Sequence, residues 1–398
     1  MKKILTLLLA LWMLTGCVAM AAGNQLVVGS TTAMSGAFFT DLFGSNTADI
    51  DVRALLHGYN LMSWDHETGT YQINDSVVAG MAVSRDAQNN RVYTFDLYGD
   101  LKFSDGSAIT AKDYAFSILL TASPELAKLG GQSAAVGAIL GMDAYQSGKS
   151  SVLRGVRLLS DTQMSITISK AYEPYFYEMA LFDYSPYPIS VLAPGCKVVD
   201  TEKGVGIVNA SGTGDAIFTA ALLQKTILDA ATGYMSHPSV VSGPYTLTRY
   251  DAQSGTASFA INPYYKGNED GEKPTIETIV YRSVSNDEAI DLLLSGEVDL
   301  LNKMVAADTI SKGIQSTADQ PFSVANYPRS GLSMISFSCE RQTVSGKAVR
   351  QAIASCFDRD ALVKAYTGNF GLKANGYFGI GQWMYQLAAG TIQPPVAD

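Results

Sequence analysis

The chain has 398 residues, of which 47% are hydrophobic and 16% are charged, and its formal net charge is -9 at pH 7. This composition is typical of a soluble globular protein, and the length suggests two or three domains. The negative charge argues against nucleic acid as a partner, because binding to phosphates requires clustered Lys and Arg.

The first residues predict an export signal. Met1–Lys3 is basic, and Ile4–Leu14 is a continuous apolar run that is too short to span a bilayer, which takes about 20 residues. Leu14–Cys17 then matches the bacterial lipobox, so we expect residues 1–17 to be a lipoprotein signal peptide with Cys17 as the lipidated residue. Simple secretion, with cleavage after Ala21, is the alternative.

The other cysteines are Cys196, Cys339 and Cys356. If Cys17 carries a lipid, this odd number allows one disulfide, but without a CxxC motif a disulfide framework is not indicated. We expect at least one of the three to be a buried free thiol.

The chain after the leader begins with a strand. Gln25–Ser30 is rich in β-forming residues, and Thr31–Gly36 follows as a loop of mostly small residues. Apolar positions then predict a helix over Val52–Leu61.

The stretch from Arg91 to Ser117 has the clearest local signals. Tyr93, Phe95 and Leu97 alternate with polar residues, which predicts a half-buried strand. Ser104–Ser107 is a Gly-containing turn. Thr110 with an Asp three residues later resembles a capping box, and the helix that it opens should end near residue 122, because Pro124 follows.

The middle of the chain is harder to interpret. Gly155–Leu159 and Met164–Ile168 are two predicted strands, and Glu173–Tyr177 should open a helix with its Pro near the first position. Cys196–Tyr234 is rich in Gly and Ala, and its weak periodicity predicts no element. The polar stretch 269–273 is a plausible domain boundary.

The remaining pattern alternates strands and helices. Ser285–Glu288 is a capping box for a helix that ends at Gly296. The other predicted elements are the strands Ile276–Tyr281, Val298–Leu300 and Leu332–Phe337 and a helix whose apolar face includes Ala348, Ala352 and Cys356. This order favours a doubly wound or mixed sheet.

Several of these segments, in this order, resemble the family 5 extracellular solute-binding proteins, which serve ABC importers for dipeptides, oligopeptides and nickel. The resemblance covers Leu26 to about Gly376. It is carried by Phe103–Gly106 with Thr110–Asp113, Ser242–Tyr245, Asn262–Tyr265, Leu294–Asp299, and Val349–Ala354 with Asp358–Arg359.

The resemblance implies an α/β, periplasmic-binding-protein-like fold of class II, in which two lobes are joined by a hinge and an extra small domain is present. Residues 25–50 and 155–270 would form lobe I, residues 51–154 the small α/β domain, and residues 271–398 lobe II.

Some features depart from the family pattern. Tyr98–Asp100 stands where a basic residue is usual, and Gly195–Gly214 is longer than expected. Because Thr391–Asp398 resembles an interior loop, we expect a truncated product with an incomplete second lobe that binds peptide weakly or not at all. A naturally short relative is the alternative.

The implied function is binding rather than catalysis. The chain would be a monomeric, lipid-anchored, extracytoplasmic lipoprotein that holds a peptide between its lobes for delivery to the permease and ATPase subunits. The alternatives are a nickel- or haem-binding relative of the same group and a surface or sensory lipoprotein.

Candidate ligand-binding residues follow from this architecture. The first lobe would contribute Thr32, Met34, Ser35 and Gly36. The second would contribute Arg329, Ser330, Ser336 and Phe337, with Arg329 as a partner for a ligand carboxylate. The alternatives are that Met34 packs in the core and that Arg329 is a solvated charge.

No catalytic set is evident. The chain has three histidines, His57, His66 and His237, and they form no HExxH pair. A GxSxG elbow and a Walker A loop are also missing from the sequence. We therefore predict that the protein is not an enzyme and has no cofactor or metal site. The alternatives are a glycosidase, since the number of Asp and Glu residues neither supports nor opposes a catalytic pair, and a metal site at His237, which is a weak candidate.

Overall fold

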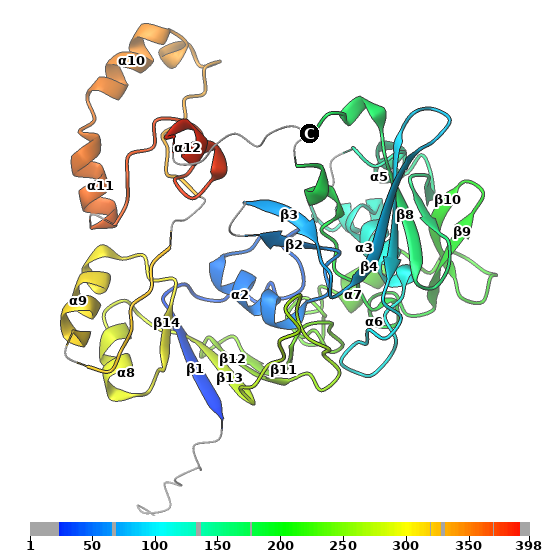
Figure 1. The fold of residues 1–398 in the computed structure, drawn as a ribbon, viewed down its shortest axis with the longest axis horizontal. Coiled ribbons are helices and arrows are strands. Elements are labelled where there is room, and N and C mark those ends of the chain that lie inside the picture. Colours follow the sequence, from blue (N-terminus) through cyan, green and yellow to red (C-terminus); the bar gives the residue numbers. More distant parts are fainter. Residues whose placement is uncertain are drawn as a thin grey trace, which may run out of the picture.

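The computed structural model of the protein describes residues 24–65, 69–132, 137–175, 177–318, 320–327, 331–368 and 370–390. The predicted signal peptide with Cys17 lies outside the described residues, as do His66, Arg329 and Ser330. In Figure 1 the antiparallel sheets lie on one side of the molecule and helices α8 to α12 on the other.

A five-stranded mixed sheet contains the predicted first strand. Its order is β11-β12-β13-β1-β14. β1 pairs parallel with β13 and with β14, and the other pairs are antiparallel. The strands are β1 (Gln25–Ser30), β11 (Tyr245–Asp251), β12 (Thr256–Ile261), β13 (Thr278–Ser283) and β14 (Leu300–Asn302).

Helix α2 (Thr47–Leu56) covers this sheet. Its buried residues Val52 and Leu56 join a core with Val28 of β1 and Phe259 of β12. The helix begins five residues before the predicted Val52, because the side chain of Asn46 caps it by accepting a hydrogen bond from the N–H of Asp49.

The connection from β13 to β14 follows the sequence closely. The hydroxyl of Ser285 accepts a hydrogen bond from the N–H of Glu288 at 3.2 Å, and α8 (Ala289–Ser295) ends at Gly296 with φ of +77°. β14 starts two residues later than expected. Because β13 and β14 pair with β1, the sheet crosses the predicted lobe boundary at residue 271; the division into lobes as a whole remains a prediction.

A four-stranded antiparallel sheet, ordered β4-β5-β8-β7, holds the segment with the clearest sequence signals. The predicted alternation is confirmed, since Tyr93, Phe95 and Leu97 are all buried. Two strands come from each side of the predicted boundary at residue 154. The strands are β4 (Val78–Arg85), β5 (Arg91–Leu97), β7 (Val156–Leu158) and β8 (Gln163–Ile168).

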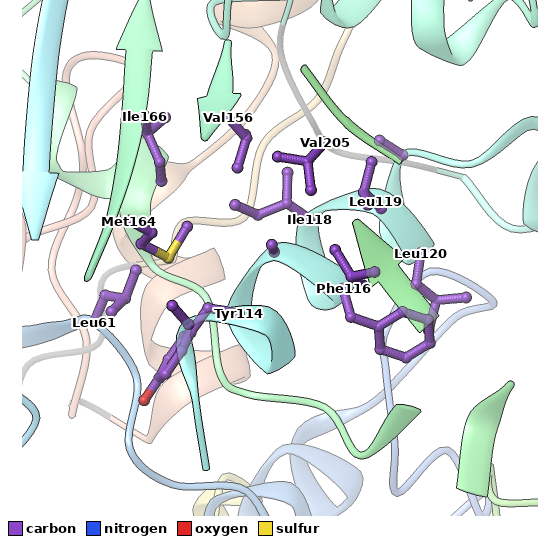
Figure 2. Close-up of a cluster of buried hydrophobic side chains, with 14 of the residues drawn as sticks. Leu61, Tyr114, Phe116, Ile118, Leu119, Leu120, Val156, Met164, Ile166 and Val205 are labelled. Carbon is purple, nitrogen blue, oxygen red and sulfur yellow. The ribbon is translucent and has the colours of Figure 1, made fainter. Parts of the chain in front are cut away.

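Helix α3 (Ala111–Thr121) lies in the largest core. Figure 2 shows its residues Phe116 and Ile118 in a cluster with Met164 and Ile166 of β8. The predicted capping box is confirmed, because the carboxylate of Asp113 accepts hydrogen bonds from the N–H and the hydroxyl of Thr110 at 2.8 and 2.9 Å.

The segment that the sequence left unassigned is ordered around a third sheet, β6-β10-β9. Its buried residues Val198, Val205 and Leu223 belong to the same core as α3. The elements are β6 (Val152–Leu153), β9 (Cys196–Thr201), β10 (Gly204–Asn209) and α7 (Ala220–Thr226), and a separate hairpin is formed by β2 (Met62–Asp65) and β3 (Thr70–Ile73).

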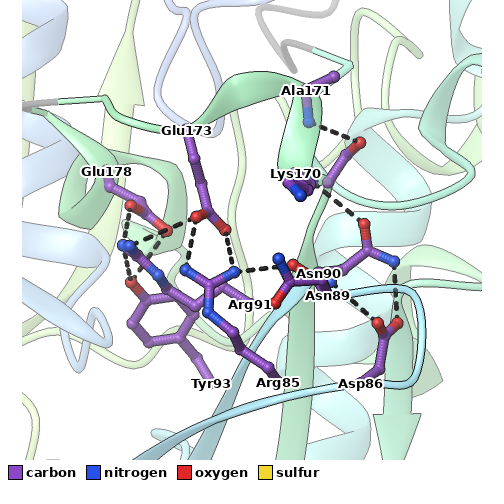
Figure 3. A network of polar contacts seen from close by, with 11 residues as sticks. Arg85, Asp86, Asn89, Asn90, Arg91, Tyr93, Lys170, Ala171, Glu173 and Glu178 are labelled. Carbon is purple, nitrogen blue, oxygen red and sulfur yellow. Dashed lines mark hydrogen bonds and ion pairs between the residues drawn. The ribbon is translucent and has the colours of Figure 1, made fainter.

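A polar network ties the β4–β5 hairpin to the segment before η2 (Glu178–Phe182) (Figure 3). Arg85 pairs with Glu173 at 2.7 Å, and Arg91 pairs with the buried Glu178 at 2.6 Å. The predicted helix at Glu173 is wrong, because these charges hold an irregular segment and the first helical turns, of 3₁₀ type, begin at Glu178.

The last part of the chain is mainly helical. α10 (Lys347–Ser355), α11 (Arg359–Thr367) and α12 (Trp383–Ala388) contain no fully buried residue. The predicted strand Leu332–Phe337 is wrong: residues 331–338 have no regular structure and pair with no strand among the described residues, and Met334 and Ile335 are exposed.

The remaining elements are short or peripheral. They are α4 (Pro124–Ala127), α5 (Met142–Gln146), η1 (Lys170–Tyr172), α6 (Ile189–Leu192), α9 (Ala307–Thr317) and η3 (Gln342–Val344). Among all described helices, none combines the length and apolar character that crossing a membrane requires.

Candidate functional site

The loop between β1 and α2 lies at the carboxyl end of the parallel strands. β1, β13 and β14 run in the same direction, so the residues after Ser30, Ser283 and Asn302 meet at one edge of the sheet. Ligands of open α/β sheets bind outside this edge. The loop, residues 31–46, is therefore the first place to look for a site.

A buried carboxylate organises the loop. Asp49 of α2 has no exposed surface, and it accepts hydrogen bonds from the N–H and hydroxyl of Ser35 at 2.9 and 2.6 Å and from the N–H of Gly36 at 3.3 Å. Hydrogen bonds to a charged acceptor are stronger than neutral ones. The loop is thus held in one conformation from inside.

The carbonyl groups that follow Ser35 are also occupied. Those of Gly36, Ala37 and Phe38 accept hydrogen bonds from Ser236 at 2.9 Å, Arg53 at 2.7 Å and His57 at 3.0 Å, respectively. Gly36 has φ of +87°, and a Cβ there would lie 3.0 Å from the hydroxyl of Ser236. Only glycine fits this position without strain.

The segment Ala33–Ser35 differs from the rest of the loop. The side chains of Ala33 and Ser35 are exposed and that of Met34 is buried, as in an extended strand. Within the part of the chain that the structure describes, no hydrogen bond engages the N–H of Ala33, either backbone group of Met34, or the carbonyl of Ser35. We call Ala33–Ser35 the open segment, because it presents main-chain donors and acceptors.

A hollow of about 440 Å³ adjoins the open segment. It is lined by Ser35–Ala37, by residues 43–46 and by Met235 with Ser236. The two walls are joined by a hydrogen bond from the N–H of Phe38 to the carbonyl of Met235 at 2.9 Å. The hollow is therefore built from segments that are 200 residues apart and firmly connected.

His57 anchors the loop to the aromatic core. Its ring lies among Phe39, Tyr187 and Tyr234, with centroids 5.9 to 6.2 Å away, and its Nε2 donates to the carbonyl of Phe38. Burial lowers the pKa of His57 to about 4, although the hydrogen bond to that carbonyl opposes the shift. The imidazole is therefore neutral near pH 7.

A second carboxylate of α2 marks the far edge of the site. Asp51 accepts hydrogen bonds from the hydroxyl of Tyr281 at 2.9 Å and from Asn302 at 2.8 Å, and it forms an ion pair with Lys303. Lys303 has φ of +54° and is the residue at which the chain leaves β14. This contact joins α2 to the point where the chain departs towards α9.

The structure brings together the predicted residues of the first lobe. Thr32 is half-buried near α2, and Ser35 and Gly36 line the hollow. The side chain of Met34 is only 8% exposed and packs in the core with Val28 and Phe38, so the packing alternative describes it.

The predicted residues of the second lobe are not brought to this loop. Ser336 is exposed and Phe337 half-buried, and in the described chain no hydrogen bond or ion pair joins them to residues 31–46. Arg329 and Ser330 are outside the described residues.

The weak metal candidate is not supported by its surroundings. The Nδ1 atom of His237 is buried without a hydrogen-bond partner, and the ring lies 6.4 Å from that of Tyr250. Within the described ranges, no group of three or more His, Cys, Asp or Glu residues could hold a metal ion.

Sequence reasoning missed most of the residues that shape the loop. Asn46 followed three residues later by Asp49 is a helix-start pattern, and it could have revealed both the cap and the buried carboxylate. Met235 and Ser236 carry no local signal, because only the fold brings them to the hollow.

Comparison with known proteins identifies the relatives of the chain. The family described as bacterial extracellular solute-binding proteins, family 5 Middle, matches residues 76–392. The oligopeptide-binding protein OppA of Lactococcus lactis (strain IL1403) is 28% identical over 233 residues, which cover 58% of this chain and 32% of that protein. The periplasmic oligopeptide-binding protein OppA of Escherichia coli K12 is 22% identical over 307 residues, covering 75% and 48%.

Solved structures share the fold. Lactococcal OppA, complexed with an endogenous peptide in the closed conformation, matches with a TM-score of 0.60 and 19% identity, over 89% of this chain and 61% of that chain. NikZ from Campylobacter jejuni, in complex with Ni(L-His), matches with a TM-score of 0.57 and 15% identity, over 89% and 57%. This chain thus spans between a third and two thirds of the length of these relatives.

The role of Asp49 can be tested by substitution. Replacing it with Ala should lower the free energy of unfolding by about 2–4 kcal/mol, because one buried and two partly buried donors lose their acceptor. Asp49→Asn keeps one oxygen and should cost less. Urea denaturation measures both, and the exposed Asp41→Ala is the matched control, with an expected change below about 0.5 kcal/mol. Equal costs for Asp49→Ala and Asp41→Ala would contradict this role.

The buried His57 predicts an acid-sensitive stability. Because its folded pKa is lowered to about 4, the unfolded chain binds an extra proton between pH 6.5 and 4. The stability from His57 is complete above pH 6.5 and falls as the pH drops towards 4, by about 3 kcal/mol at most.

The comparison that isolates this effect is between the wild type and His57→Gln. Asp113 acts in the opposite direction, since burial raises its pKa to about 6 and its contribution is lost as the pH rises through that value. The difference between the unfolding free energies of the two proteins, measured from pH 8 to 4, should shrink as the pH falls. A constant difference would show that His57 does not titrate in this way.

Proposed function

This chain belongs to family 5 of the bacterial extracellular solute-binding proteins, and from that membership we propose that it binds peptides and delivers them to an ABC importer. The family is non-enzymatic and extracytoplasmic, and its members work with ABC transporters. Peptide binders and a nickel-complex binder are both among the similar proteins, so the choice of solute rests on the site itself.

The observation that carries the peptide proposal is the open segment. Ala33–Ser35 follows β1 at the carboxyl edge of the sheet, and its side chains alternate between exposed and buried. Among the described residues, the N–H of Ala33, both backbone groups of Met34 and the C=O of Ser35 form no hydrogen bond. A peptide that adds as a strand satisfies such groups through its own main chain, whatever its side chains. A compact metal complex offers no comparable row of donors and acceptors.

The surrounding loop favours binding because it is already ordered. Asp49, Arg53 and His57 occupy the other polar groups of the loop, so little conformational entropy remains to be lost when a ligand arrives. We propose that the helices after β14, from α9 to α12, belong to the second lobe, which would close over the peptide.

Titration calorimetry tests the main-chain proposal. We expect saturable binding of pentaalanine and at least about tenfold weaker binding of the same peptide with N-methylated central amides, because methylation removes donors without changing the side chains. Ni(L-His) is the competing probe. Equal affinity for both peptides, or binding of Ni(L-His) in place of peptide, would overturn the proposal.

We also propose that the protein is lipid-anchored through Cys17, on the strength of the lipobox Leu14–Cys17. Expressed in bacteria, the wild type should incorporate labelled palmitate and sediment with membranes. Cys17→Ser should remain unlabelled. Release of unlabelled wild-type protein, cleaved after Ala21, would show that the leader directs simple secretion.

A further inference from the structure

We propose that the hollow beside the open segment is a specificity pocket that takes one uncharged side chain of the bound peptide. The inference rests on the proposed function and adds a chemical preference to it. The pocket is lined by Ser35–Ala37, residues 43–46, Met235 and Ser236.

The position of the hollow places it within reach of a peptide on the open segment. Ser35 belongs to both, so the two sites are continuous. Successive residues of an extended peptide are about 3.3 Å apart, and alternate side chains point to the same face. A side chain of a peptide that pairs with the free groups of Ala33–Ser35 would then be within reach of the hollow.

The electrostatics of the lining select against charge. None of the side chains that line the hollow is ionisable. The two ionised groups behind it are engaged with the loop: Asp49 accepts from Ser35 and Gly36, and Arg53 donates to the carbonyl of Ala37 and the hydroxyl of Ser45 at 2.7 and 2.8 Å. A charged side chain that entered would lose water without gaining a counter-charge.

The lining of the hollow contains both apolar and uncharged polar residues. Phe43 and Met235 are half-buried apolar residues of the lining, and Ser45 and Asn46 are its uncharged polar residues, whose side chains also bond Arg53, Ala33 and Asp49. The hydrogen bonds from Phe38 to Met235 and from Ser236 to Gly36 hold the walls together. A shallow, uncharged hollow of this kind suits apolar and amide side chains such as those of Leu and Gln.

The test is a set of pentaalanine peptides in which each position in turn carries Leu, Gln, Lys or Asp, titrated calorimetrically into the full chain. At one position we expect Leu and Gln to bind about tenfold more tightly than Lys and Asp. Met235→Glu should make Lys the preferred residue at that position, and Met235→Trp should remove the advantage of Leu over Ala. Val83→Glu adds the same charge on the exposed strand β4 and should leave the order unchanged.

The outcomes separate the two proposals. If peptides bind with the same order of affinity in the wild type and in both Met235 variants, the pocket is overturned while peptide binding stands. If none of the peptides binds to the wild type, the proposed function is overturned and the pocket with it. Thermal unfolding of each variant, with a single transition close to that of the wild type, ensures that a changed order does not come from misfolding.

Discussion

The buried carboxylate of Asp49 is the interaction on which the candidate site depends. A loop at the end of a parallel strand has many polar main-chain groups and few apolar side chains, so nothing in its own composition holds it in one shape. Here a helix that is itself fixed in the core supplies a charged acceptor to two consecutive N–H groups and a hydroxyl. The loop thus takes its order from α2.

The division between occupied and free main-chain groups explains how one loop can be both rigid and receptive. From Gly36 to Phe38 every carbonyl has a side-chain donor from another part of the fold. In the directly preceding segment, Ala33–Ser35, the N–H of Ala33, both backbone groups of Met34 and the carbonyl of Ser35 form no hydrogen bond among the described residues. A ligand can therefore add hydrogen bonds without breaking any. A protein that binds peptides of different sequence needs such free main-chain groups, because the backbone is the part that all peptides share.

The parts of the fold that were predictable are those with local causes. The alternation of Tyr93, Phe95 and Leu97 and the capping box at Thr110 depend on neighbours within a few residues, and the structure has both. At Ser285 the predicted contact with Glu288 is present, but the helix itself is capped at Glu288. The pairing of β1 with β13 and β14 joins residues some 250 to 270 positions apart, so no local sequence pattern could predict it. The hollow was unpredictable for the same reason, since Met235 reaches Ser35 only through tertiary contacts. The error at Leu332–Phe337 shows the converse, because a segment rich in apolar residues does not form a strand where the described chain offers it no partner strand.

Through the ion pair between Asp51 and Lys303, α2 also contacts the residue that follows β14. Asp49 faces the loop, and two residues further on Asp51 holds the residue at which the chain departs from the sheet. A short helix thus connects the loop of the candidate site to the residue at which the chain leaves the sheet. A small tilt of α2 about the core contacts of Val52 and Leu56 would move both Asp49 and Asp51. Ligand binding at the loop and the orientation of the helices after β14 would then be coupled directly through α2.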